Sequence, residues 1–328
     1  MAYTFPKFED LPPVPGAPQG CLWGFYDRDG QKDKIGSINL LTAEVVKEAS
    51  TEIRTGKHVQ LDWPLDSLKF PTWDRKILDH QLLDMSQTVY KSYAFDDEIS
   101  INTQACSQWD GLKHWSHTEQ HVFYNGLTFE EASNSKERGI HNFCDRGGIV
   151  GRGVFIDMVR YWEKIGQTPP DAWGNYEITV DELEAALADQ QTQTRQGDIL
   201  LVRTGYIKRY NEASSEAERQ EGTQANFRSI GLAPRNDMLR WLYDRHFAAV
   251  VADNVSVEAL PAPPENSPSL ALHDWCLVWW GTPLGELWNL EELSGVCNDL
   301  GRWTFFLTSA PLNITGGAAS PPGAIAIF

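Results

Sequence analysis

The chain has 328 residues, of which 41% are hydrophobic and 22% are charged, a composition typical of a globular protein with a large core. Its 28 lysines and arginines stand against 45 aspartates and glutamates, which gives a formal net charge of −17. Such a charge repels phosphate backbones and anionic lipids, so we expect neither nucleic acid nor a membrane as a partner.

The cysteines and the N-terminal sequence indicate in which cellular compartment the protein is expected. The five cysteines are widely spaced and form no CxxC pair, which excludes a disulfide framework and a thiolate zinc site. Residues 1–9 lack the basic and apolar stretches of a signal peptide, and no apolar run reaches membrane-spanning length. We therefore expect a reduced, soluble protein of the cytoplasm.

The first third of the chain contains few regular elements. Its proline-rich opening predicts an extended arm over residues 1–20, followed by a single domain over residues 21–328. Thr42 is placed to cap the N-terminus of a first helix, and residues 58–62 alternate like a strand. Residues 124–132 are predicted to be a loop that leads into a polar insertion.

The rest of the chain alternates strands and helices irregularly, which favours one mixed α/β domain. The glycines in residues 148–157 predict a turn before a short apolar strand. A dinucleotide fingerprint needs the strand before its glycines, so no organic cofactor is expected. Buried strands are predicted over 197–203, 248–252 and 324–328, and helices after the capping box Thr179–Glu182 and over 238–246.

Two groups of titratable residues are candidates for chemistry, and Asp253 with Glu258 makes a third, weaker pair. Asp110 and His114 lie four apart around a glycine, where a carboxylate and an imidazole can share a metal or form an oriented base. The alternative is a surface aspartate and an ordinary hydrogen-bonded histidine. His273 begins an apolar, tryptophan-rich run, and Glu286 follows a glycine turn. Acids and imidazoles in such apolar stretches rarely lack a partner.

Tryptophans flank both groups, and the chain contains 13 of them. Such rings are found in cores and subunit interfaces, and they also wall pockets for flat apolar ligands. If the two groups converge, Trp109, Trp115 and Trp279 line the cleft between them and bind an aromatic small molecule. Asp253 follows the strand 248–252 directly, at the end where α/β sheets present functional groups, and is a further candidate for substrate binding.

One segment carries a family resemblance. The stretch Gln104-Ala-Cys-Ser-Gln108-Trp-Asp110-Gly-Leu-Lys-His114 is similar to the His-x-Gly-Thr-His-x-Asp-x-Pro-x-His signature of the cyclase family of metal-dependent hydrolases, which includes bacterial kynurenine formamidase and isatin hydrolase. Shorter blocks resemble that family in order and spacing, at residues 20–42, 123–126, 148–157, 197–205, 251–258 and 273–293.

The resemblance implies a fold and an assembly. It implies a single α/β domain with a mixed, barrel-like β-sheet flanked by helices, of the swivelling β/β/α type. It also implies a homodimer or homotetramer that acts on a small aromatic molecule. Tyr124, within the matching block 123–126, is added to the candidate substrate-binding residues.

This chain departs from the signature at two metal ligands. The family's first two histidine ligands are Gln104 and Gln108 here, whereas Asp110 and the acid–base histidine, His114, are kept. The later family ligands correspond to His273 and Glu286. Because glutamine is only a weak, neutral oxygen donor, two outcomes stay open. Zinc or manganese is held by Asp110, His273 and Glu286, or no metal is bound.

Two enzymatic functions and one non-catalytic function follow. The first is a hydrolase that cleaves an amide, lactam or ester bond of an aromatic substrate, with His114 as general acid and base. The alternative is a metal-independent cyclase, lyase or isomerase of an aromatic or polyketide-like metabolite, in which Asp110 and His114 do the acid–base work and Gln104 and Gln108 donate to an oxyanion. The third is a scaffold that binds a ligand without catalysis. The retained acids and histidines argue against this third function.

Overall fold

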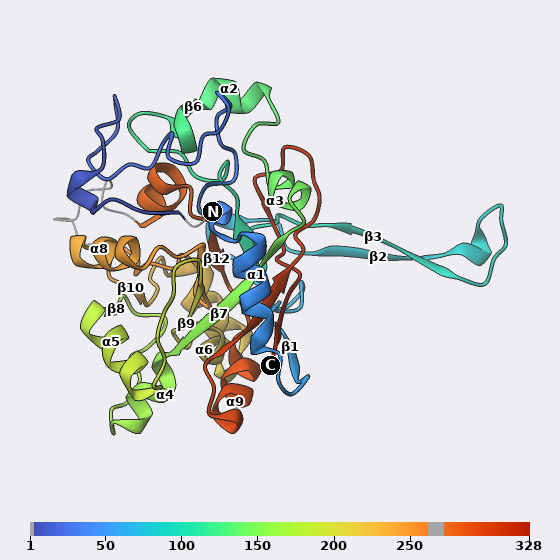
Figure 1. The fold of residues 1–328 in the computed structure, drawn as a ribbon. Coiled ribbons are helices and arrows are strands. Elements are labelled where there is room, and N and C mark those ends of the chain that lie inside the picture. The colour runs from blue at the N-terminus through green and yellow to red at the C-terminus, as the bar shows by residue number, and fades with distance from the viewer. Residues whose placement is uncertain (1–2, 262–271) are drawn as a thin grey trace.

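The computed structural model describes residues 3–261 and 272–328, and a nine-stranded mixed sheet organises it (Figure 1). Four parallel strands form its centre: β7 (Ile149–Asp157), β9 (Ile199–Arg203), β11 (Ala249–Ala252) and β12 (Leu284–Glu286). Antiparallel strands extend both sides, with β13 (Thr304–Ser309), β15 (Ala324–Ile327) and β1 (His58–Gln60) beyond β7, and β4 (Gln108–Asp110) and β14 (Ala319–Ser320) beyond β12.

Helices flank this sheet, which curls into a half-barrel, so the expected single α/β domain with a barrel-like sheet is confirmed. The α-helices are α1 (Ala43–Ala49), α2 (Phe129–Asn134), α3 (His141–Asp145), α4 (Met158–Lys164), α5 (Val180–Asp189), α6 (Tyr206–Glu212), α7 (Glu216–Gln220), α8 (Asn236–Arg245) and α9 (Glu291–Leu300). Short 3-10 and π-helical segments are η1 (Phe8–Asp10), η2 (Gly36–Leu40), η3 (Ser50–Glu52), η4 (Thr72–Asp74), η5 (Met85–Gln87), η6 (Tyr124–Gly126), η7 (Glu221–Ala225) and η9 (Asp274–Trp280).

Local sequence signals explain several of these boundaries. The Thr42 hydroxyl accepts a hydrogen bond from the backbone N–H of Val45 and caps α1 as predicted. Thr179 and Glu182 form the predicted capping box at the start of α5. Strands β9 and β11 are buried along their whole length, as their continuous apolar sequences indicate.

Two sequence-based predictions were wrong. The glycine-rich stretch before residue 157 is not a turn but part of the long strand β7. A Cβ at Gly151 would lie 2.7 Å from Leu41, and one at Gly153 would lie 2.2 Å from the Phe305 ring, so these glycines make room for packed neighbours rather than for a bend. Residues 124–132 are not a loop throughout, because helix α2 begins at Phe129.

The N-terminal segment packs against the body of the protein. Phe8 and Leu11 are buried in the common core, and the Tyr243 hydroxyl of α8 donates to the carbonyl of Pro6. Its description as an arm separate from residues 21–328 stays a prediction. None of the described helices is both long and apolar enough to span a membrane.

Smaller paired strands surround the main sheet. They are β5 (Val122–Phe123) with β6 (Leu127–Thr128), β8 (Glu177–Ile178) with β10 (Gly231–Leu232), and β2 (Asp79–Asp84) with β3 (Phe95–Ser100). The last pair forms a long hairpin, residues 79–100, that projects from the body (Figure 1) and that we did not predict from the sequence.

Candidate active site

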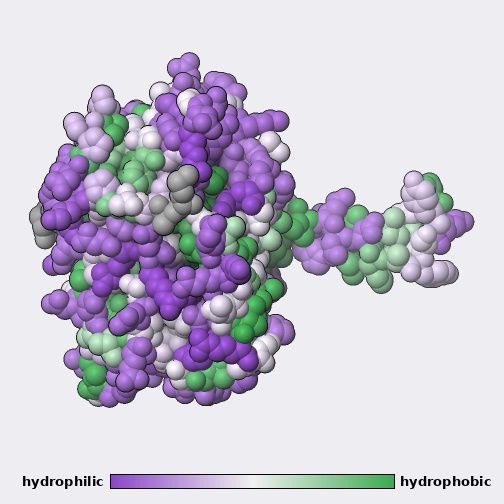
Figure 2. Space-filling model, viewed as in Figure 1, coloured by the Kyte–Doolittle hydropathy of each residue, from purple (hydrophilic) through white to green (hydrophobic). Residues whose placement is uncertain are grey.

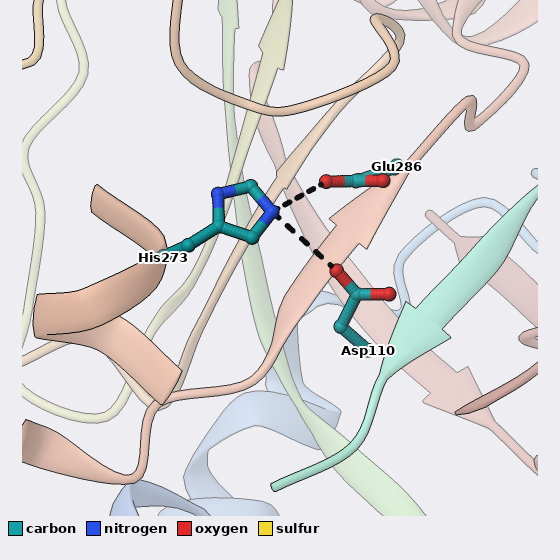
Figure 3. A group of neighbouring side chains, drawn as sticks. All are labelled: Asp110, His273 and Glu286. Carbon is teal, nitrogen blue, oxygen red and sulfur yellow. Dashed lines mark ion pairs between the residues drawn. The ribbon is translucent and has the colours of Figure 1, made fainter. Parts of the chain in front are cut away.

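Strands β4 and β12 bring the two predicted groups of residues together. Their antiparallel pairing sets Gln108 opposite Glu286 and Leu284 opposite Asp110. Side chains two apart on a strand, and those directly opposite across a pair, point to the same face. Asp110, Gln108 and Glu286 therefore share one face of the sheet, and His273, just before η9, approaches that face (Figure 3).

Asp110, His273 and Glu286 form a compact group (Figure 3). The Nε2 atom of His273 lies 3.2 Å from Glu286 Oε1 and 3.9 Å from Asp110 Oδ2. One ligand atom from each residue lies within 4.8 Å of the other two. Both carboxylates are buried, at 0% and 2% exposure. One nitrogen and two carboxylate oxygens form a three-ligand set of the kind that catalytic metal sites use.

The side-chain amides of the site hydrogen-bond to only one oxygen of each carboxylate. Gln104 Nε2 donates to Asp110 Oδ1 at 2.5 Å, and Gln108 Nε2 donates to Glu286 Oε2 at 2.7 Å. The second oxygen of each carboxylate, Asp110 Oδ2 and Glu286 Oε1, is buried without a hydrogen-bond partner among the described residues, as is Gln108 Oε1. Such atoms are costly in a folded protein, and a bound cation would satisfy them. The residues present therefore fit a divalent metal.

Glu258 orients His273. Its carboxylate lies 2.7 Å from His273 Nδ1 and accepts backbone N–H groups of Leu272 and His273. The ring is thereby turned so that Nε2 faces Asp110 and Glu286, an arrangement common behind metal-binding histidines. The sequence indicated Glu258 only as part of a third, weaker pair with Asp253, and its contact with His273 was not predicted.

Burial and like charge perturb the ionisation of this group. Burial, and next the Asp110 carboxylate, raise the pKa of Glu286 to about 7. Burial opposes the charge on His273, but its contacts with Glu258 and Glu286 more than offset this, so the pKa of His273 lies well above its usual value. Without a cation, a proton is therefore held between the imidazole and the carboxylates.

His114 lies at the edge of the group. Its Nε2 is 3.9 Å from Asp110 Oδ1, too far for a hydrogen bond, and burial lowers its pKa below the ordinary value. A neutral imidazole at pH 7, close to but not bonded to a carboxylate, is free to accept a proton from a bound molecule.

A cavity of about 460 Å³ opens onto His114, His273 and Glu286. Aromatic and aliphatic side chains form much of its wall, and one cationic side chain, Arg75, completes it; the further lining residues are Trp73, Trp115, Val255, Ser256, Glu258 and Leu260. The Trp115 indole N–H donates to Asp274, which holds the ring 5.3 Å from that of His273. Neither Trp73 nor Arg75 was predicted from the sequence, since no motif distinguishes them.

Four residues expected to bind substrate do not line this cavity; Trp109, Trp279, Tyr124 and Asp253 are all buried elsewhere. Trp109 alternates with Gln108 and Asp110 along β4, so its ring faces away from them and packs on Trp288. Trp279 packs on Trp23, and the Tyr124 hydroxyl donates to Asp33. Asp253 accepts three hydrogen bonds from Thr204 and Gly205 and thereby fixes the turn after β9.

Comparison with known proteins identifies the family. A family model described as "Putative cyclase" matches residues 41–259. The chain belongs to the cyclase family. A solved structure described as a novel cyclase is 30% identical, with a TM-score of 0.80, over 94% of this chain and 99% of the other.

More distant structures share the fold of this cyclase-family chain. Isatin hydrolase A from Labrenzia aggregata, bound to benzyl benzoate, is 20% identical with a TM-score of 0.57 over 88% of this chain and 98% of its own. An isatin hydrolase bound to the product analogue thioisatinate is 16% identical with a TM-score of 0.58 over the same shares. No curated protein matches the sequence.

Proposed function

We propose that this chain is a hydrolase that cleaves an amide, lactam or ester bond of a small aromatic substrate at a divalent metal, zinc or manganese. The observation that carries the proposal is that two buried oxygens, Asp110 Oδ2 and Glu286 Oε1, converge on His273 Nε2 at 3.9 and 3.2 Å and have no hydrogen bond to any other described residue. When bound by these three residues, the metal supplies Lewis-acid activation of a carbonyl or of water.

The side chains of the site orient the ligands, transfer the proton and bind the substrate. Glu258 fixes the direction of the His273 ring, and the two glutamine amides fix the outer oxygens of Asp110 and Glu286. His114 receives a proton from the attacking water at Nε2 and returns it to the leaving group. Trp73 and Trp115 hold the aromatic ring against the apolar wall and exclude water from it.

The aromatic substrate class rests on two observations. The cavity wall carries two tryptophans, and two structurally similar isatin hydrolases were solved with aromatic ligands, benzyl benzoate and thioisatinate. A homodimer or homotetramer and a cytoplasmic location stay predictions.

A metal-free cyclase, lyase or isomerase is the second candidate, favoured by the pKa of Glu286 near 7, which makes this residue a proton-carrying acid at neutral pH. The expected role of Gln104 and Gln108 as oxyanion donors fits the geometry less well. Gln104 Nε2 already donates to Asp110, and Gln108 Nε2 already donates to both Glu286 and Gln104 Oε1.

Metal analysis separates the candidates. Protein purified without chelator, with and without added zinc or manganese, is assayed for bound metal and for hydrolysis of an aryl formamide and an aryl ester. We expect about one ion per chain, lost in Glu286→Gln and retained in Glu48→Gln, whose exposed carboxylate does not line the cavity. Protein that binds no ion after supplementation contradicts the hydrolase proposal and supports the metal-free one.

A further inference from the structure

One arginine lines the cavity that opens onto His273 and Glu286. Among the described residues of the cavity wall, Arg75 alone carries a permanent positive charge. Burial lowers the pKa of this half-buried side chain, but a guanidinium stays charged at neutral pH. A charge beside aromatic and aliphatic side chains is costly unless an opposite charge accompanies it.

Two contacts fix the orientation of the Arg75 guanidinium. Its Nη1 donates to the backbone carbonyl of Gln104 at 3.1 Å, and the Trp73 ring lies 4.6 Å from its Cζ. The backbone turns sharply here, because Trp73 and Asp74 both adopt left-handed conformations, with φ of 62° and 49°. Such conformations are uncommon outside glycine and cluster at ligand sites. The guanidinium is therefore oriented by its neighbours before any ligand binds.

Most donors of Arg75 have no partner within the described chain. A guanidinium carries five N–H groups, and the Gln104 carbonyl accepts one of them. Two acids share the cavity wall, yet no described carboxylate lies within ion-pair distance of Arg75. Glu258 instead contacts His273 Nδ1, and Glu286 contacts His273 Nε2. The charge of Arg75 is therefore available to a bound molecule.

We propose that Arg75 binds a carboxylate of the substrate, so that the molecule cleaved is an aromatic amide, lactam or ester that also carries a carboxylate. The inference rests on the proposed function, because it names the substrate class of the same cavity. A carboxylate is planar and matches the fork of a guanidinium with two parallel hydrogen bonds, which favours it over other anions.

The position of Gln104 indicates how large this substrate is. Its backbone carbonyl accepts the Arg75 hydrogen bond, and its side-chain Nε2 donates to Asp110 Oδ1 at 2.5 Å. One residue therefore contacts both the guanidinium and a carboxylate of the metal group. A single aromatic ring with two substituents can bridge such a separation, and a cavity of about 460 Å³ accommodates it. We expect the carboxylate on the same ring as the bond that is cleaved.

The charge of the whole protein makes this local contact necessary. Hydrophilic side chains cover most of the face of the body seen in Figure 2, and the net charge is −17. Such a molecule repels anions, although salt screens the repulsion beyond about 8 Å at physiological ionic strength. Under the proposed function, the two charges of the metal ion balance Asp110 and Glu286. Arg75 then supplies the positive charge that a substrate carboxylate needs.

The test compares substrates that differ only in charge. Metal-loaded protein is assayed with 2-acetoxybenzoate and 3-acetoxybenzoate, and with the corresponding acetoxybenzamides, in which a neutral amide replaces the carboxylate. The variants are Arg75→Gln, Arg75→Lys and the control Arg54→Gln, an exposed arginine that does not line the cavity. We expect the wild type and the control to prefer one benzoate about tenfold or more in kcat/KM. Arg75→Gln should lose this preference through a higher KM for the benzoate alone, and Arg75→Lys should keep part of it.

A binding measurement separates this inference from the proposed function. Benzoate and benzamide are titrated into the same proteins and tryptophan fluorescence is followed, because Trp73 and Trp115 line the cavity. Benzoate should bind Arg75→Gln about tenfold or more weakly than the wild type, whereas benzamide should bind both equally. If this difference is found but no ester is hydrolysed, the proposed function fails and the carboxylate site stands. If esters are hydrolysed without it, the proposed function stands and this inference fails.

Three results would overturn the proposal. One is a wild type that does not distinguish benzoates from benzamides. Another is a preference that persists in Arg75→Gln, which would place the carboxylate at the metal. The third is an equal loss with both substrates, which would make Arg75 a counter-charge for the metal ligands. Circular dichroism establishes folding. If Arg75→Gln does not fold, Arg75→Lys decides, because lysine cannot form the paired hydrogen bonds. Its benzoate affinity should fall several-fold with benzamide affinity unchanged, and equal affinities contradict the proposal.

Discussion

At the scale of single residues, the site is defined by the buried polar atoms that accept no hydrogen bond from the amides around them. Gln104 and Gln108 occupy the outer oxygens of Asp110 and Glu286, and Glu258 occupies the far nitrogen of His273. What is left is one imidazole nitrogen and two oxygens that face each other. Under the proposed function, the two glutamines that stand where the resemblance implies histidines support a smaller ligand set of Asp110, His273 and Glu286.

His114→Asn should lower kcat by roughly 10²–10⁴-fold, the usual worth of a positioned general acid or base. The steady-state rate on an aryl ester or formamide measures this. His121→Asn is the control, because His121 is exposed and does not line the cavity. Unchanged turnover in a folded His114→Asn protein would remove this residue from the mechanism.

Metal affinity should depend steeply on pH. Burial and the neighbouring Asp110 raise the pKa of Glu286 to about 7, so below that pH a proton competes for the oxygen that would bind the metal. The dissociation constant for zinc, measured by competition with a chelating dye, should rise at least about tenfold per pH unit below 7. A flat profile in the wild type would contradict the assignment of Glu286 as a ligand.

Restoring both family histidines tests the role of the glutamines. In Gln104→His with Gln108→His, two imidazoles replace the amides that now hold Asp110 and Glu286. The hydrolase proposal expects tighter metal binding with hydrolysis kept or raised, whereas the metal-free alternative expects metal gain with loss of native turnover. Metal content and rate, measured on the same preparation, distinguish them. A folded double variant that changes neither places both residues outside the reaction.

At the scale of elements, local sequence patterns were sufficient to predict several strands and helix caps. They were not sufficient to predict which strands pair when these are distant in the sequence. Strands 197–203 and 248–252 and the helix caps at Thr42 and Thr179 followed from local sequence. The convergence of Asp110 with Glu286 was expected from the family signature. Its cause is the antiparallel β4–β12 pair, in which Gln108 and Glu286 are 178 residues apart, and no local pattern encodes such a pairing. The same limit hid the position of Trp109, since three residues of β4 gave too short an alternation to assign a face.

Thr179→Ala should lower the free energy of unfolding by about 1 kcal/mol, because its hydroxyl accepts the Glu182 N–H and the Glu182 carboxylate accepts the Thr179 N–H. Urea denaturation followed by circular dichroism measures the change. The exposed Thr168→Ala is the control and should stay close to the wild type. Equal stability of the two variants would show that the box does not contribute.

At the scale of the whole molecule, charge and the hairpin act against each other. Each copy carries a net charge of −17, and the hairpin itself is acidic, so two copies repel as they approach. In the predicted homo-oligomer, the exposed apolar side chains at the tip of the hairpin, Val89, Tyr90 and Tyr93, would supply the attraction. The net charge follows directly from the composition, whereas the hairpin was not predicted because residues 79–100 mix apolar and acidic side chains on one face, with Asp97 opposite Leu82.

Salt should therefore strengthen self-association. The Debye length falls from about 30 Å at 0.01 M to about 8 Å at 0.15 M, which screens the repulsion between acidic copies while leaving the apolar contact intact. The dimer dissociation constant, measured by sedimentation across this range, should decrease several-fold. Neutralising charge on the hairpin with Asp96→Asn plus Glu98→Gln should flatten the dependence. If salt instead weakens association, ion pairs rather than apolar contacts stabilise the dimer.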